Sequence, residues 1–154
     1  MLEVILIAVG VWATFNYFNT NVADIPQEVL TAMRTSSSSF GVPVALLLAI
    51  GKHESGFKQN VTGKAGEIGI MQILPSTGAD LGFSVADLKE LQGNTNCAAM
   101  FLSKLLTKYK GKIADVIAAY NAGKVVLSSG GLYFNLNYVL MVYSYYTFYS
   151  MRRI

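Results

Sequence analysis

The chain has 154 residues, of which 53% are hydrophobic and 14% are charged, and its net charge is +3. The length predicts one domain with a real core, and the composition is shifted toward that of membrane proteins. With one cysteine, Cys97, and one histidine, the chain offers no internal disulfide and no convincing zinc site. No basic run with interleaved aromatic residues occurs, so we expect no specific nucleic-acid partner. The mild positive charge fits an anionic wall polymer or an anionic lipid surface.

Residues 4–18 form an apolar segment whose only polar members are Thr14 and Asn16. The segment is short for a membrane span, which needs about 17–25 residues. Glu3 stands where a secretory signal carries Lys or Arg, and the aromatic residues of the segment suit a membrane interface. We interpret residues 1–20 as a hydrophobic helix that anchors the chain in a lipid membrane. The alternatives are the first core helix of a soluble domain and a cleaved signal.

Residues 21–154 are predicted to form an all-α domain. Asp24, as an N-cap before Pro26, predicts the start of a helix whose apolar residues recur at helical spacing. We expect this helix to end in the polar loop Ser36–Ser39. The next helix has Pro43 in its first turn, where the missing N–H costs nothing.

Glu54 occupies the last turn of this second helix. Leu47, Ile50 and Glu54 fall at positions i, i+3 and i+7, so they share one face, which is apolar and should point inward. A carboxylate there is poorly solvated and lies where the helix dipole disfavours negative charge, and both effects raise its pKa. General-acid catalysis requires a carboxyl group that stays protonated near neutral pH. The alternative is a frayed helix end whose glutamate meets solvent.

The stretch from Gly56 to Gly69 is rich in glycine, which predicts irregular backbone or a short hairpin over a cleft. Two short helices are expected next, at residues 75–81 and 85–91, the second with Ser84 as its N-cap. A longer helix follows, for which Asn94 is the expected cap, and its lysines form a solvated face.

A further helix is predicted at residues 113–120, with Gly123 as the left-handed residue beyond its end. Tyr120 and Asn121 lie at its C-terminal edge, where they are either a core tyrosine and a capping amide or members of a site. A linker rich in Ser and Gly separates this helix from a last helix at residues 134–150, which is dense in tyrosine.

Three short motifs occur in order: Glu54-Ser55-Gly56, Gly69-Ile70-Met71-Gln72 and Ala118-Ala119-Tyr120-Asn121-Ala122-Gly123. In order and spacing they resemble the motif set of the lytic transglycosylases with a goose-lysozyme-like fold. The resemblance extends from about Ile25 to about Tyr146. Tyr138-Val139 also resembles the Tyr-Val of this family, although the Glu-Thr that usually precedes it is replaced by Asn135-Leu136-Asn137.

The resemblance implies a lysozyme-like domain that cuts the β-1,4 bond between N-acetylmuramic acid and N-acetylglucosamine in peptidoglycan, with no cofactor. It implies that Glu54 protonates the glycosidic oxygen and then accepts the proton of the muramyl 6-hydroxyl, which attacks C1 to give a 1,6-anhydro product. The implied substrate-binding residues are Ser55, Met71, Gln72, Tyr120, Asn121 and Tyr138. Ser55 is expected to hold Glu54 or the acetamido group through its hydroxyl.

Glu67 leaves a second mechanism open. It lies in the loop before Gly69, where it is either a solvated glutamate or a second carboxylate that activates water, as in a hydrolytic lysozyme of the same fold. A third hypothesis is a membrane-bound protein that binds glycan strands without cutting them. We expect a membrane-associated location facing the peptidoglycan, in a virion membrane or a bacterial envelope. The short chain favours a phage virion enzyme over a secretion or conjugation accessory enzyme.

Overall fold

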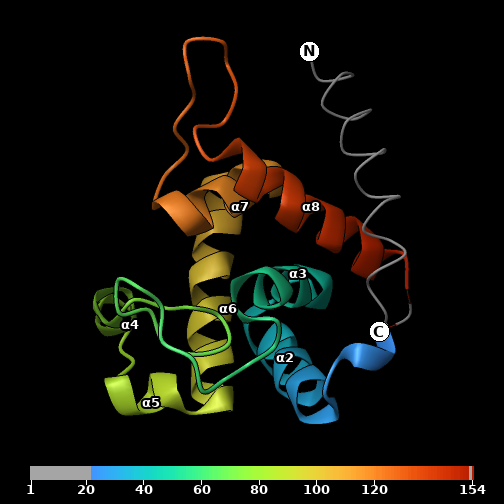
Figure 1. Ribbon diagram of the computed structural model, residues 1–154, viewed down its shortest axis with the longest axis vertical. Helices are drawn as coiled ribbons and strands as arrows, with labels where there is room; N and C mark the ends of the chain where they lie inside the picture. The colour runs from blue at the N-terminus through green and yellow to red at the C-terminus, as the bar shows by residue number, and fades with distance from the viewer. Residues whose placement is uncertain (1–21, 153) are drawn as a thin grey trace.

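The computed structural model describes residues 22–152 and residue 154 (Figure 1). The described residues form helices and no β-strand, which confirms the all-α prediction for this part of the chain. The hydrophobic helix predicted for residues 1–20 lies outside the described residues. None of the described helices has the length and apolar character needed to cross a bilayer. The elements are η1 (Val22–Asp24), α2 (Gln27–Phe40), α3 (Val44–Ser55), α4 (Pro75–Asp80), α5 (Val85–Lys89), α6 (Leu91–Lys108), α7 (Ile113–Ala122) and α8 (Leu136–Ser150).

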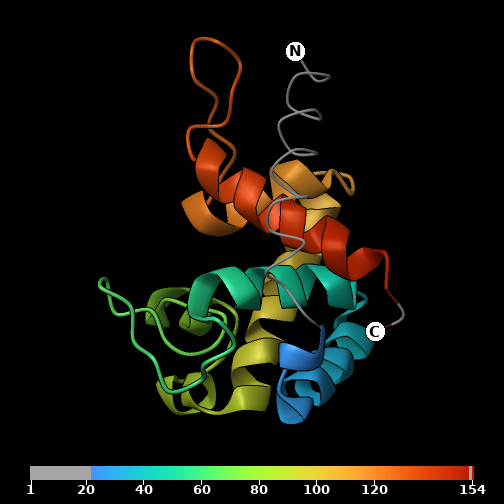
Figure 2. The ribbon, with the colours of Figure 1, turned by 45° about the vertical axis from the view of Figure 1, so that its right-hand side comes forward.

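Helix α3 lies in the middle of the molecule. It packs against α8 on one side and against α2 and α6 on the other, as Figure 2 shows. Leu47 and Ile50 are fully buried as predicted, but every residue from Ala45 to Gly51 is buried as well. The helix is therefore enclosed on all sides, and its apolar character extends around its whole circumference rather than along one face.

Helix α3 ends directly after the predicted catalytic residue. Gly56 takes the left-handed conformation at the end of the helix, with φ of 60°, and its N–H donates to the carbonyl of Lys52. Glycine adopts this conformation without steric cost. The chain turns away at this point, so Glu54 keeps its place in the last turn while the following loop is free to form one wall of a pocket.

The prediction that the helix of residues 27–40 ends at the serine run was wrong. Helix α2 continues through the serines to Phe40, because their hydroxyls find partners within the fold. Ser36 is fully buried, donates to Asn96 Oδ1 at 2.8 Å and accepts from Gln92 Nε2 at 3.0 Å, which ties α2 to α6. Ser39 donates to the carbonyl of Thr35, one turn earlier in the helix.

The prediction that Asn94 caps the long helix was also wrong, since α6 begins at Leu91 and Asn94 lies inside it, fully buried. The cap predicted at Ser84 is confirmed: its hydroxyl accepts from the N–H of Asp87, and the Asp87 carboxylate accepts from the N–H of Ser84. Gly123 takes the left-handed conformation predicted at the end of α7.

Two loops complete the described fold. The loop between α3 and α4 is irregular and contains isolated antiparallel bridges of Ile68 with Thr62 and with Ile73. The segment between α7 and α8, expected as a linker, forms a hairpin-like projection held by a bridge between Leu127 and Tyr133. In Figures 1 and 2 this second loop extends away from the helices.

Candidate active site

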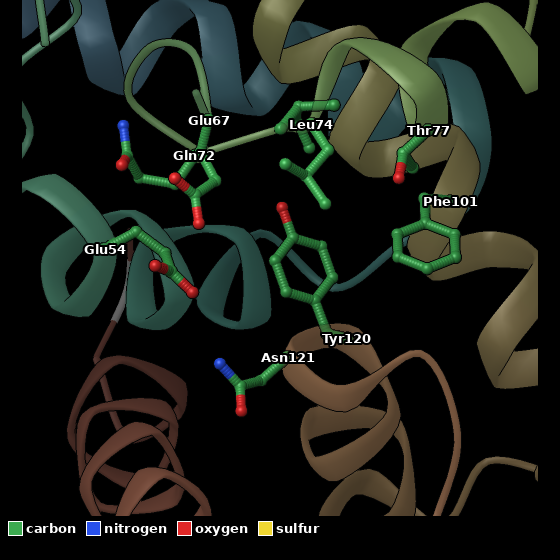
Figure 3. A pocket seen from close by; sticks show the side chains of 9 residues that line it. Glu54, Glu67, Gln72, Leu74, Thr77, Phe101, Tyr120 and Asn121 are labelled. Carbon is green, nitrogen blue, oxygen red and sulfur yellow. The ribbon is translucent and has the colours of Figure 1, made fainter. Parts of the chain in front are cut away.

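A pocket opens between the end of α3, the loop before α4, helix α6 and the end of α7 (Figure 3). It brings together residues that lie far apart in the sequence. Among them are two carboxylates, Glu54 and Glu67, and two carboxamides, Gln72 and Asn121. The lining residues are Glu54, Glu67, Gln72, Ile73, Leu74, Thr77, Phe101, Tyr120 and Asn121.

Glu54 extends from α3 into this pocket, as seen in Figure 3. Its side chain is partly buried, and burial raises the pKa of the carboxyl group above its usual value. The hydrogen bond from Tyr138 acts in the opposite direction and lowers the pKa, while the negative charge of Glu67 raises it further. The net effect is a raised pKa, so the protonated form of Glu54 persists to higher pH than that of a solvated glutamate.

Tyr138 comes from the first turn of α8, 84 residues beyond Glu54, and donates a hydrogen bond to Glu54 Oε1 at 2.6 Å. Burial and the charge of Glu54 hold the pKa of this phenol well above its usual value, so it remains a donor. The ring of His53 packs edge-on against Tyr138 at 4.8 Å between centroids. The structure thus brings the Tyr138 phenol to Glu54 although the Glu-Thr pair typical of the resembled family is missing.

The buried side-chain amide of Asn94 holds the loop that carries Gln72 in place through hydrogen bonds to its backbone. Asn94 Oδ1 accepts from the N–H of Met71 at 2.9 Å, and its Nδ2 donates to the carbonyls of Ile68 and Leu88, both at 2.8 Å. A Cβ atom on Gly69 would lie 2.4 Å from Asn94 Nδ2, so a glycine is required where the amide approaches the backbone.

Gln59 supports the same loop from a second direction. Its Oε1 accepts from the N–H of Ile70, and its Nε2 donates to the carbonyls of Leu88 and Lys89. Neither Gln59 nor Asn94 was predicted to have a role at the site. The signal for Asn94 was present in the sequence, since it stands three and four residues before Cys97 and Ala98 on the buried face of α6.

The structure places the side chains of Ser55 and Met71 away from the pocket, whereas the resemblance implied that both contact the substrate. The Ser55 hydroxyl donates to the carbonyl of Ile70 at 2.8 Å and accepts from the N–H of Lys58 at 3.1 Å. Met71 is fully buried. Neither side chain is among those that line the pocket. Adjacent residues of a helix point in different directions, so Ser55 reaches the loop while Glu54 reaches the pocket.

Gln72, Tyr120 and Asn121 all line the pocket, in agreement with their predicted placement. Gln72 adopts a left-handed backbone conformation with φ of 49°, and its Nε2 donates to the carbonyl of Gly69 at 2.8 Å. The Tyr120 hydroxyl donates to the carbonyl of Met71 at 2.9 Å. The aromatic ring is therefore the part of Tyr120 that is available to a ligand in the pocket.

Asn121 lies on the exposed rim of the pocket. Its Oδ1 accepts a hydrogen bond from Asn135 Nδ2 at 2.8 Å, and that same nitrogen donates to the carbonyl of Ala118. The contact leaves the amide nitrogen of Asn121 available as a donor to a ligand. Thr77 and Phe101 complete the far wall, and neither was predicted as a site residue.

Glu67 enters the pocket from the irregular loop, where its Oε2 accepts from the N–H of Ala65 at 2.9 Å. The fold therefore gathers two carboxylates at one site, as the hydrolytic alternative requires. No cluster of three or more potential metal ligands occurs in the part of the chain that the structure describes. Cys97 lies in the core, and burial raises the pKa of its thiol to about 11.

Comparisons with known proteins point in the same direction as the geometry. Residues 31–130 match the family model described as the transglycosylase SLT domain. A membrane-bound lytic murein transglycosylase C of Histophilus somni is 30% identical in the aligned part, which takes in 67% of this chain and 33% of that relative. The protein of the same name from Glaesserella parasuis is 31% identical, over 63% of this chain and 31% of the relative. The chain thus spans about a third of the length of these curated relatives.

Solved structures show the same fold. The 70 kDa soluble lytic transglycosylase of Escherichia coli superposes with a TM-score of 0.66 and 21% sequence identity, over 79% of this chain and 24% of that one. An inactive mutant of the lytic transglycosylase Slt from Pseudomonas aeruginosa gives a TM-score of 0.64 at the same identity and coverage. At this identity the likeness establishes the architecture of the domain.

Proposed function

Because this chain belongs to the transglycosylase SLT domain family, we propose that it is a peptidoglycan lytic transglycosylase. Its substrate is the β-1,4 bond between N-acetylmuramic acid and N-acetylglucosamine. The observation that carries the proposal is the Glu54 carboxyl group, which lies in the pocket with a raised pKa and a phenol donor on one oxygen.

In the proposed reaction Glu54 acts first as an acid and then as a base. It gives its proton to the glycosidic oxygen as the bond to C1 breaks, and it then accepts the proton of the muramyl 6-hydroxyl as that oxygen bonds to C1. No water is consumed: the N-acetylmuramic acid keeps a 1,6-anhydro ring, and the N-acetylglucosamine leaves with the protonated oxygen. The substrate's own acetamido group stabilises the positive charge at C1.

Tyr138 supports both stages of this cycle. A hydrogen bond to the ionised carboxylate offsets part of the cost of burying its charge, so Glu54 exists in either protonation state during turnover. We propose that Gln72 and the ring of Tyr120 contact sugar from the walls of the pocket and that Asn121 does so from its rim. Ser55 and Met71 act through the loop that presents Gln72.

The second candidate is hydrolysis by a lysozyme of the same fold, and the presence of Glu67 in the pocket favours it. In that reaction Glu67 activates a water molecule that attacks C1 in place of the 6-hydroxyl. Mass analysis of digested peptidoglycan separates the two. Transglycosylation gives anhydromuramic ends, which are one water lighter than reducing ends. Reducing ends alone would assign the chain to the hydrolytic class, and intact glycan would assign it to the binding proteins.

The cellular setting is part of the proposal. We place the catalytic domain at residues 21–154 and a membrane anchor at residues 1–20, with residues 4–18 in contact with lipid. The names of the curated relatives, which describe membrane-bound enzymes acting on murein, support a location at the cell envelope. For the apparatus that carries the enzyme we prefer a phage virion, with a secretion or conjugation apparatus in the bacterial envelope as the alternative. Immunogold labelling of purified virions tests the choice directly.

A further inference from the structure

The projection between α7 and α8 is a two-stranded turn of residues 125–135, which we call the α7–α8 hairpin. Leu127 forms an antiparallel bridge with Tyr133, and the N–H of Phe134 donates to the carbonyl of Val126 at 2.8 Å. The N–H of Ser128 donates to the carbonyl of Leu132 at 2.7 Å, so the pairing continues toward the tip. Figures 1 and 2 show the hairpin extending away from the helices.

The hairpin turns one face toward the domain and one face outward. Residues directly opposite each other on paired strands share a face, so Leu127 lies with Tyr133 and Val126 lies with Phe134. The Tyr133 hydroxyl donates to Asp115 Oδ1 at 2.7 Å, which fixes its face against α7. The opposite face carries Phe134, which is 80% exposed, and Val126, which is 37% exposed. Leu127 is 54% exposed although Tyr133 beside it is tied to α7, so the hairpin presents three exposed apolar side chains.

Four lysines lie close in sequence to the two residues that meet at the base of the hairpin. The N–H of Val125 donates to the Tyr109 hydroxyl at 3.2 Å, which places the hairpin base beside the end of α6. Lys108 lies over the Tyr109 ring at 5.3 Å from its centroid. The exposed basic residues near this contact are Lys108, Lys110, Lys112 and Lys124, which we call the lysine group.

Charge is distributed unevenly along the chain. From Leu91 to the end there are seven lysines and arginines and a single acidic residue, Asp115, whose carboxylate is already engaged by Tyr133. The earlier part of the chain holds the other eight of the nine acidic residues. The half of the sequence that builds the hairpin is therefore strongly basic, although the net charge of the whole chain is only +3.

We propose that the α7–α8 hairpin and the lysine group form a docking surface for an anionic lipid bilayer, separate from residues 4–18. The outward apolar side chains enter the boundary between headgroups and acyl chains, and the lysines lie against the lipid phosphates. Exposed Val and Phe beside several cations suit this boundary. A glycan strand would instead call for hydrogen-bonding groups around an aromatic ring.

The test uses the full chain and vesicles of phosphatidylcholine, with and without phosphatidylglycerol. Because residues 4–18 are themselves proposed to bind lipid, the measured quantity is the ratio of the two partition coefficients. We expect each Lys→Gln change at Lys112 or Lys124 to lower this ratio about fivefold at low salt. Lys58→Gln and Lys89→Gln are matched controls from the part of the chain before Leu91 and should leave the ratio unchanged.

The apolar part of the surface is tested with Phe134→Ser, which should lower partitioning into anionic vesicles about tenfold or more. Its control is Val85→Ser, since Val85 is 46% exposed on α5, away from the hairpin. Cleavage of soluble glycan fragments should be the same in all these variants. The proposal is overturned if the lysine and Phe134 variants partition like the unaltered chain. It is also overturned if Phe134→Ser loses glycan cleavage while vesicle binding persists, because the hairpin would then bind sugar.

Discussion

The surroundings of Glu54 act on the pKa of its carboxyl group in opposite directions, and this balance determines whether the group can act as an acid and as a base. Burial and the neighbouring Glu67 favour its neutral form, whereas the hydrogen bond from Tyr138 favours its ionised form. Such a balance suits a group that must both donate and accept a proton, because neither its protonated nor its ionised form is strongly favoured over the other.

Replacing Glu54 with Gln removes the proton donor and keeps nearly the same shape. We expect Glu54→Gln to lower turnover of purified peptidoglycan by about 10²–10⁴-fold or more, since that is the usual contribution of general acid–base catalysis. The melting temperature should stay close to that of the unaltered chain. Glu28→Gln, at an exposed position of α2, is the matched control and should keep full activity. Near-normal turnover in Glu54→Gln would remove Glu54 from the mechanism.

The pH dependence of activity should respond in opposite directions to two substitutions. Tyr138→Phe removes the hydrogen bond that lowers the pKa of Glu54, so the acid form persists longer and the basic limb of kcat/KM moves to higher pH. Glu67→Gln removes a negative charge that raises this pKa, so the basic limb moves to lower pH. Measuring kcat/KM against pH for both variants checks the pair. Shifts of the same sign would contradict the electrostatic account.

The sequence pointed to three residues that the fold brings to the pocket, because their signal is local. Glu54, Gln72 and Asn121 belong to short motifs, and each motif is placed by the helix or loop that contains it. The roles of Ser55 and Met71 were not predictable in this way. Which of several neighbouring side chains faces a pocket depends on the packing of the loop against α6, and no short motif encodes that packing.

At the scale of elements, the loop between α3 and α4 takes its shape from buried amides rather than from strand pairing. Asn94 supplies one acceptor and two donor contacts to three backbone groups. The sequence predicts a helix cap at Asn94, because asparagine is common at the first position of helices. The backbone groups that satisfy it come from residues 68, 71 and 88, and their convergence is a property of the folded chain.

Removing this amide should destabilise the fold. Asn94→Ala removes three hydrogen bonds and leaves the N–H of Met71 without its partner, whereas the carbonyls of Ile68 and Leu88 still accept from Ile73 and Gln59. We expect the free energy of unfolding to fall by about 3 kcal/mol, near 1 kcal/mol for each lost hydrogen bond. Urea denaturation followed by circular dichroism measures the change. Asn60→Ala, at an exposed position of the same loop, is the control and should stay within about 0.5 kcal/mol. A similarly small change in Asn94→Ala would show that water replaces the amide.

The serine run in α2 shows a second way in which packing outweighs local preference. Four successive serines favour a loop because their hydroxyls compete for backbone groups. Here Ser36 faces α6, where Asn96 and Gln92 supply its partners, and Ser37 donates to the carbonyl of Val42. The helix therefore persists until the left-handed Gly41 ends it.

At the scale of the whole molecule, the site is a meeting point of distant segments around one buried helix. Glu54 comes from α3, Gln72 from the loop after it, Asn121 from α7 and Tyr138 from α8. Since α8 packs along α3, the phenol reaches the carboxylate across the interface of these two helices. The candidate site is thus assembled from described residues, and none of the candidate site residues lies in residues 1–20.

Deletion of residues 1–20 should consequently separate membrane attachment from catalysis. Residues 4–18 offer ten large apolar side chains, and burial of even half of them at about 1.5–3 kcal/mol each would outweigh the cost of one Asn near an interface. We expect the full chain to float with lipid vesicles even at high salt, because apolar burial is not screened by ions. The truncated chain should keep its activity on glycan fragments and its melting transition, and any remaining attachment to anionic vesicles should be released by salt. Full-length protein that stays in the soluble fraction, or a truncated chain that unfolds, would identify the segment as a core helix instead.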